Sequence, residues 1–205
     1  MLKTCALTIL ATAALACGGA GDDPAAALVG RWELHDDQTG ELESIYDFAA
    51  DGDFAYREYG EGAESNRGTY ETDGGLLLLE GTDDEGSHLT GEVTYFADSE
   101  RLILGALLPD GEVDGPVGRW SGSVRVESGG EVELDAESTY ELASDGSATI
   151  TSRGDGDSQT REATWVEEAG EIVVSFESSG IMVNIHMVLI EGSALGSPVY
   201  QRAEE

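Results

Sequence analysis

Leu28-Val29-Gly30-Arg31-Trp32 returns later in the chain as Pro116-Val117-Gly118-Arg119-Trp120. The motifs that follow each pentapeptide also match in order. The first is a strand pattern that begins with tyrosine and leads to Asp-Gly, at 46–52 in one copy and 140–146 in the other. The second is a Thr-aromatic pair followed by an apolar run, at 69–79 and 164–174. Motifs that keep their order along a chain indicate an internal duplication. The sequence therefore predicts two related domains, over residues 28–112 and 116–205.

The local pattern within each copy has a period of two. Residues 124–134 read VRVESGGEVEL, in which valine and leucine alternate with charged residues on both sides of Gly129-Gly130. This alternation around a glycine turn predicts an antiparallel hairpin with one apolar face. No amphipathic helical pattern follows residue 27. We therefore predict an all-β fold of two tandem small antiparallel barrels or sandwiches, with a single larger barrel made by both copies as the alternative.

The charge of the chain is extreme. It has 42 acidic and 10 basic residues, a formal net charge of -32, and its sole lysine is Lys3. Such a surface repels phosphate backbones and anionic headgroups, which argues against nucleic-acid binding and favours divalent cations or basic proteins as partners. A second interpretation is that the carboxylates keep the protein soluble, for example in salty surroundings.

The N-terminus reads as an export signal. A charged start and a short apolar run over residues 1–16 have the pattern of a bacterial signal peptide, and Ala14-Leu15-Ala16-Cys17 resembles the lipobox of bacterial lipoproteins. The resemblance implies acylation of Cys17, and Gly18 after it favours the outer membrane or cell surface over the inner membrane. Residues 17–27 are expected to be a flexible tether. The alternative is an ordinary signal peptide that leaves Cys17 as a bare thiol.

The two copies also resemble a known family. Gly30-x-Trp32, the strand from Tyr46 to Asp51-Gly52, and Gly68-Thr69-Tyr70 before a leucine run are similar to the bacterial lipocalin-like domain. The resemblance implies small barrels whose Gly-x-Trp tryptophan lies at the closed end, stacked by an arginine of the last strand. It therefore implies that Trp32 and Trp120 are barrel-closing residues and that Arg202 stacks on Trp120, while Trp32 has no evident partner.

No catalytic signature is present, and neither a cofactor nor a metal site is expected. Asp110-Gly111-Glu112-Val113-Asp114-Gly115 resembles the start of a calcium loop, but its twelfth position is Ser121, so an acidic linker is the preferred interpretation. Asn184 and His186 share one face of an apolar strand, which is either a ligand-facing or a solvent-facing pair. We predict a non-enzymatic, membrane-anchored lipoprotein that binds a small apolar or amphiphilic ligand. The alternative is an acidic envelope module that binds cations or a basic protein.

Overall fold

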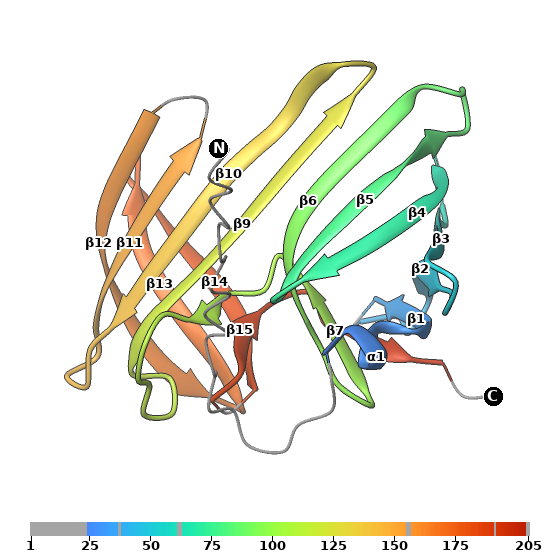
Figure 1. The fold of residues 1–205 in the computed structure, drawn as a ribbon. Coiled ribbons are helices and arrows are strands. Elements are labelled where there is room, and N and C mark those ends of the chain that lie inside the picture. Colours follow the sequence, from blue (N-terminus) through green and yellow to red (C-terminus); the bar gives the residue numbers. More distant parts are fainter. Residues whose placement is uncertain (1–23, 37, 61–62, 155–156, 191, 204–205) are drawn as a thin grey trace, which may run out of the picture.

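The computed structural model describes residues 24–36, 38–60, 63–154, 157–190 and 192–203. Within them a short helix, α1 (Pro24–Leu28), is followed by strands alone (Figure 1). The strands are β1 (Gly30–His35), β2 (Leu42–Phe48), β3 (Asp53–Glu58), β4 (Ser65–Asp73), β5 (Leu76–Asp83), β6 (His88–Ala97), β7 (Arg101–Leu104), β8 (Leu108–Pro109), β9 (Gly118–Ser128), β10 (Glu131–Leu142), β11 (Ser147–Gly154), β12 (Asp157–Glu168), β13 (Glu171–Ser178), β14 (Ile181–Ile190), β15 (Ala194–Gly196) and β16 (Tyr200–Arg202). The predicted all-β antiparallel barrel fold is confirmed.

The strands β1 to β6 form a continuous meander, and so do β9 to β15, because each strand pairs with its neighbour in sequence. Tight turns join them. Gly52 and Gly146, at matching positions of the two repeats, both have positive φ angles, 93° and 83°. A residue without a Cβ adopts this conformation readily. The Asp-Gly pairs therefore mark turns, as the sequence predicts.

The first barrel is closed by the last strand of the chain. β7 pairs with β6 and with β16, and β16 pairs in turn with β1, so that eight strands form a ring. In this ring Tyr200 lies opposite Leu102, and Arg202 lies opposite Trp32. Residues from the end of the second repeat thus complete the barrel of the first.

The second ring is closed by the reciprocal exchange. β8, from the end of the first repeat, pairs with β9 through Leu108 and Pro109. Just before it, Leu107 exchanges two backbone hydrogen bonds of 2.8 and 2.9 Å with Leu195 of β15. The predicted ranges 28–112 and 116–205 follow the repeat, but each range contributes its final strand to the barrel of the other.

The two barrels also share a sheet edge. The N-terminal half of β6 pairs with β9 from Leu89 to Val93, while its C-terminal half pairs with β7. The sheet therefore runs without a break from one barrel into the other (Figure 1). A small apolar cluster of Ile103, Ala106, Ile190 and Ala194 unites side chains of both repeats where the final strands cross.

The expected stack of Arg202 on Trp120 is wrong, because the exchange brings Arg202 to the other tryptophan. Its guanidinium carbon lies 4.3 Å from the centre of the Trp32 ring. The guanidinium also donates to the backbone oxygens of Ser99, Val29 and Ala27 at 2.9, 2.9 and 2.5 Å. Such cation–π contacts contribute about 0.5–2 kcal/mol.

Trp120 has an equivalent place in the second barrel, but among the described residues no arginine stacks on it. Both tryptophans are fully buried. The indole N–H of Trp32 donates to the oxygen of Leu28 at 2.8 Å, and that of Trp120 donates to the oxygen of Pro116 at 2.9 Å. The residue paired with Trp120 across the barrel seam is Pro109, in the place that Arg202 takes beside Trp32.

Part of the predicted tether belongs to the folded protein. Residues 24–27 lie in α1, where Ala27 and the adjacent Leu28 are buried in the core of the first barrel. Proline suits the first position of a helix and alanine is the best helix former, so PAAAL makes one turn once it has a surface to cover. The expectation of a flexible segment is wrong for these residues, and 17–23 lie outside the described residues.

Aromatic side chains fill the first barrel. Tyr46 is central to them, with its ring centre 5.6 Å from that of Phe48, 4.6 Å from that of Tyr56 and 5.5 Å from that of Tyr200. Phe48 in turn contacts Tyr70 edge-on at 5.1 Å. These rings come from β2, β3, β4 and the exchanged strand β16, so the first barrel has a packed interior.

We expect the packed tyrosines to make the protein less stable at alkaline pH. Burial raises the pKa of Tyr46, Tyr56 and Tyr200, that of Tyr56 to about 12. Unfolded tyrosines lose their protons near pH 10, so above that pH the folded state holds more protons and the free energy of unfolding falls. The stabilisation is complete below pH 10 and is lost as the pH rises through 10 towards 12. Urea unfolding at pH 9 and 11 measures it.

The variant Tyr46→Phe should weaken this pH dependence, because it removes one buried phenol. Tyr59→Phe, at a side chain that is 41% exposed, is the matched control. Equal urea midpoints at pH 9 and 11 in the parent chain would contradict the prediction.

Candidate functional site

The sequence suggested two local sites, acylation at Cys17 and a stretch at 110–115 that resembles a calcium loop. Cys17 and the signal peptide lie outside the described residues. Asp110, at the start of the stretch that resembles a calcium loop, forms an ion pair with Arg119 at 3.0 Å. Among the residues that the structure describes, no three His, Cys, Asp or Glu side chains are grouped closely enough to hold a metal ion.

Asn184 and His186 belong to the outer face of β14. His186 lies opposite Val173, and its Nδ1 is 2.9 Å from a carboxylate oxygen of Glu171. Asn184 accepts a hydrogen bond of 2.9 Å from the Ser175 hydroxyl. Both pairs are exposed, which supports the solvent-facing interpretation and removes these two residues from any interior site.

The interior of the second barrel contains a hollow of about 190 Å³. Its walls come from β9, β10 and β14, and its floor comes from the two segments that carry the final strands across, near Gly105 and Gly196. Apolar side chains predominate, with a few polar groups among them. The lining includes Leu107, Val124, Ala136, Ser138, Tyr140, Ile185 and Met187. The exchange of strands therefore shapes this hollow as well as closing the barrel.

The end of the second barrel away from Trp120 carries exposed apolar side chains. Because successive strands alternate in direction, the turns at 129–130 and 179–180 lie together at that end. Leu134 and Ile181, next to these turns, are 46% and 67% exposed. Ile181 alternates along β14 with the inward-facing Val183 and Ile185. This rim therefore carries exposed apolar side chains, whereas Trp120, towards the opposite end, is fully buried.

Among the described residues, one arginine faces the interior of the second barrel. Arg161 lies opposite Ile150 of the core, and residues paired across two strands point to the same side of a sheet. Its guanidinium carbon is 5.2 Å from the centre of the Phe176 ring, and its Nη2 donates to Gln159 at 2.7 Å. Within the described residues no carboxylate lies within 4 Å of it. The inner face thus combines apolar walls with one cation that has no counter-ion.

The wall residues of this hollow escaped prediction from the sequence. Ala136 and Ser138 lie on a strand with an ordinary polar and apolar pattern, and so does Arg161, which faces the same interior. Their inward direction depends on the pairing register, and a shift of one residue would turn them outward. For Arg161 the one available signal was that it falls in the same strand phase as Ala163 and Trp165.

No protein-family model, curated protein or solved structure matches this chain. Among the described residues, no helix has the length and hydropathy needed to cross a membrane.

Proposed function

We propose that this protein is a non-catalytic, lipocalin-like binding protein whose second barrel takes a small amphiphile with an anionic head. The observation that carries the proposal is the interior of the second barrel, which combines a hollow with apolar walls and, on β12 of the same inner face, Arg161. The tail of the ligand would occupy the hollow and its head would pair with the guanidinium. Aromatic rings fill the interior of the first barrel, so we do not assign this ligand to that interior.

The charge of the protein strengthens the assignment of Arg161. With 42 acidic against 10 basic residues, a carboxylate is available to most arginines. Arg153, one strand away, is paired with Glu137 at 3.6 Å. An arginine that faces an apolar interior without such a partner keeps its charge available for a ligand carboxylate, and a charge-assisted hydrogen bond contributes about 1.5–3 kcal/mol.

The proposal places the binding protein at the cell envelope, attached through acyl chains on Cys17. The support is the lipobox-like sequence and the short apolar segment before it. Several acyl chains hold a protein stably on a bilayer, since each buried CH₂ contributes about 0.8 kcal/mol. The mass of the mature N-terminal peptide tests this placement independently of ligand binding.

Calorimetry with octanoate and 1-octanol tests the binding role. The parent protein should bind both, and octanoate more tightly. Arg161→Gln should weaken octanoate binding about tenfold or more, from the lost charge-assisted contact, and leave octanol binding almost unchanged. Ala136→Phe, which fills the hollow, should abolish binding of both.

Arg153→Gln is the matched control, because it removes an exposed arginine of the same barrel that already has a carboxylate partner. If the parent chain binds neither compound, or if Arg153→Gln and Arg161→Gln have the same effect, the proposal is wrong.

A further inference from the structure

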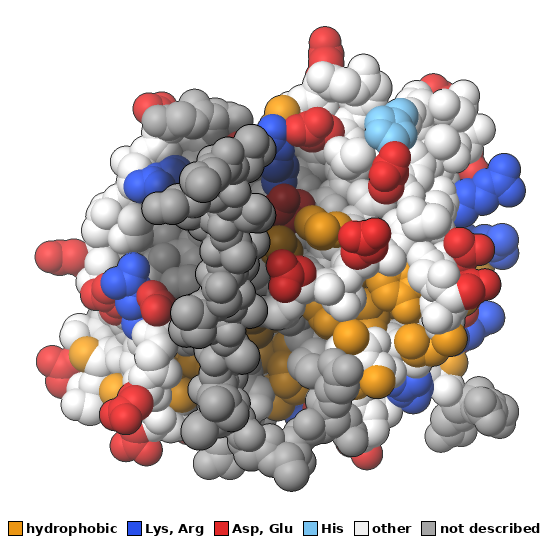
Figure 2. All heavy atoms as spheres, in the orientation of Figure 1, with side chains coloured by type: hydrophobic (Ala, Val, Ile, Leu, Met, Phe, Trp, Pro, Cys, Tyr) orange, Lys and Arg blue, Asp and Glu red, His pale blue; other side chains and the backbone are white. Residues whose placement is uncertain are grey.

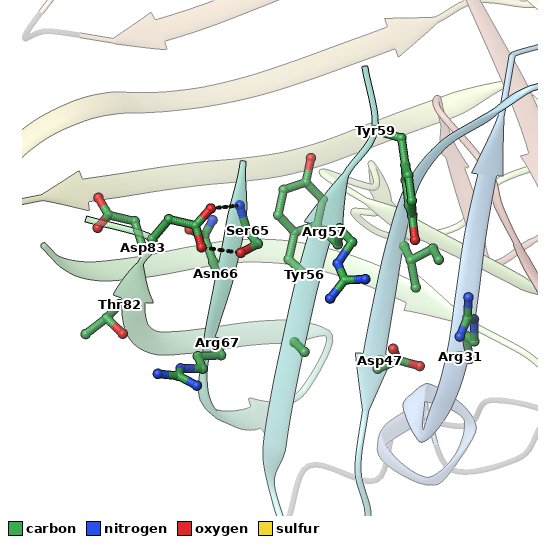
Figure 3. A pocket seen from close by; sticks show the side chains of 13 residues that line it. Arg31, Asp47, Tyr56, Arg57, Tyr59, Ser65, Asn66, Arg67, Thr82 and Asp83 are labelled. Carbon is green, nitrogen blue, oxygen red and sulfur yellow. Dashed lines mark hydrogen bonds between the residues drawn. The ribbon is translucent and has the colours of Figure 1, made fainter. Parts of the chain in front are cut away.

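The outer face of the first barrel has a second hollow, of about 600 Å³. A row of directly opposed residues crosses it from strand to strand, with Arg31 opposite Asp47, Asp47 opposite Ala55 and Ala55 opposite Arg67. The small side chain of Ala55 leaves space between its longer neighbours. Figure 3 shows the resulting groove, with the arginine side chains projecting from β1, β3 and β4 around it.

Arg57 and Arg67 lie diagonally across the neighbouring strands β3 and β4, and both line this groove. Arg67 lies opposite Ala55, and Arg57 is two residues further along the same strand as Ala55. Such diagonal neighbours have backbones about 7–8 Å apart, well within reach of one group held between two long side chains. An anion placed between them would neutralise both cations.

These arginines lack the partners that most others in the chain have. Five of the arginines are paired with carboxylates, and Arg202 donates to backbone oxygens. In the part of the chain that the structure describes, no carboxylate lies within 4 Å of Arg57, Arg67 or Arg161. Arg161 faces the interior of the second barrel, whereas Arg57 and Arg67 face the same outer groove. Figure 2 shows acidic and basic side chains over both halves of the molecule, with several basic ones along its right-hand edge, on the side of the first barrel.

Nearby aspartates are held by other donors. Asp84 accepts hydrogen bonds from the backbone N–H and the hydroxyl of Ser65. Asp83 accepts from the backbone N–H groups of Glu85 and Ser87 at 2.9 and 2.7 Å. These contacts tie Asp84 to the start of β4 and hold Asp83 in the β5–β6 turn. Asp47 also lines the groove, but among the described residues no carboxylate lies within 4 Å of Arg57 or Arg67.

The groove also has an apolar wall. Ile45 lies opposite Arg57 on the outer face, yet is only 4% exposed. Tyr59 contributes its half-exposed ring beside it, and its backbone N–H donates to the oxygen of Glu43 at 2.8 Å, which ties the end of β3 to β2. In Figure 3 the ring of Tyr59 and the guanidinium of Arg57 project into the same space. A ligand for this groove would combine a charged group with a flat or aliphatic body.

We propose that the outer groove of the first barrel is a second binding site, for a small organic anion. Its anionic group, a carboxylate or phosphate, lies between Arg57 and Arg67, and its apolar body lies against Ile45 and Tyr59. Bidentate contacts suit this arrangement, because the planar guanidinium matches both anionic groups. The site is separate from the interior of the second barrel and does not depend on it.

Calorimetry on the full chain with phenyl phosphate and inorganic phosphate tests the proposal, at about 0.15 M salt so that long-range attraction is screened. The parent chain should bind phenyl phosphate more tightly than inorganic phosphate, because the ring adds contact with the apolar wall. The double variant Arg57→Gln with Arg67→Gln should weaken phenyl phosphate binding at least tenfold.

The matched control is Arg119→Gln with Arg153→Gln, which removes the same charge from exposed, already paired arginines of the second barrel. It should retain the affinity of the parent chain. The proposal is overturned if the parent chain does not bind phenyl phosphate, or if the two double variants lose affinity equally. Octanoate binding that survives in the Arg57 and Arg67 variant would show that the interior site is unaffected.

Discussion

A chain that ends at Val199 will lose the closed form of the first barrel. This truncation removes β16, and with it the buried ring of Tyr200 and the contacts of Arg202 with Trp32 and three backbone oxygens. Loss of a buried aromatic side chain alone costs about 3–5 kcal/mol. The whole strand should therefore contribute about 5 kcal/mol or more, comparable with the total stability of many domains.

Hydrogen exchange is the decisive measurement, because it separates the two barrels. Amide protection should fall in β1 and β7, which β16 joins, and persist in β10 to β13 of the second barrel. A chain that ends at Ala203 keeps β16 and is the control. If β1 remains protected in the shorter chain, the last strand does not close this barrel.

Cutting the chain between the repeats will not separate them. A protease site placed at 112–114 leaves three sets of contacts intact: the pairing of β6 with β9, the exchanged strands, and the apolar cluster around Ile103. We expect the cleaved protein to elute as one species of unchanged mass, measured by size-exclusion chromatography with light scattering. The fragments should part only in denaturant.

Neither repeat should form a stable barrel alone. In an isolated first repeat β8 would have to replace β16, but Pro109 would then stand where Arg202 stands and would supply neither a backbone N–H nor a guanidinium. The isolated fragments 24–112 and 116–205 should therefore show weak amide protection, which recovers when they are mixed. Two fragments that elute separately with full protection would contradict an obligatory exchange.

The arginine of the interior and those of the outer groove differ in how far the sequence could reveal them. Arg161 shares its strand phase with Ala163 and Trp165, but the pairing register decided that this phase faces the core. Arg57 and Arg67 are ten residues apart in sequence on separate strands, and their proximity depends on the β3–β4 register. Charged residues on an outer strand face are common, which is why neither was singled out.

The amino-acid sequence by itself determined the elements of this protein and their duplication. Alternation of apolar and charged residues specifies strands, and Asp-Gly pairs provide the positive φ angles of the turns, because both are local properties of the chain. The tertiary structure alone decided which final strand closes which barrel. The two repeats offer nearly equivalent seams, so local preference cannot choose between them. The choice follows from side-chain contacts between distant residues, above all those of Arg202 with Trp32. That Trp32 has no partner within its own repeat was the one sequence signal of the exchange.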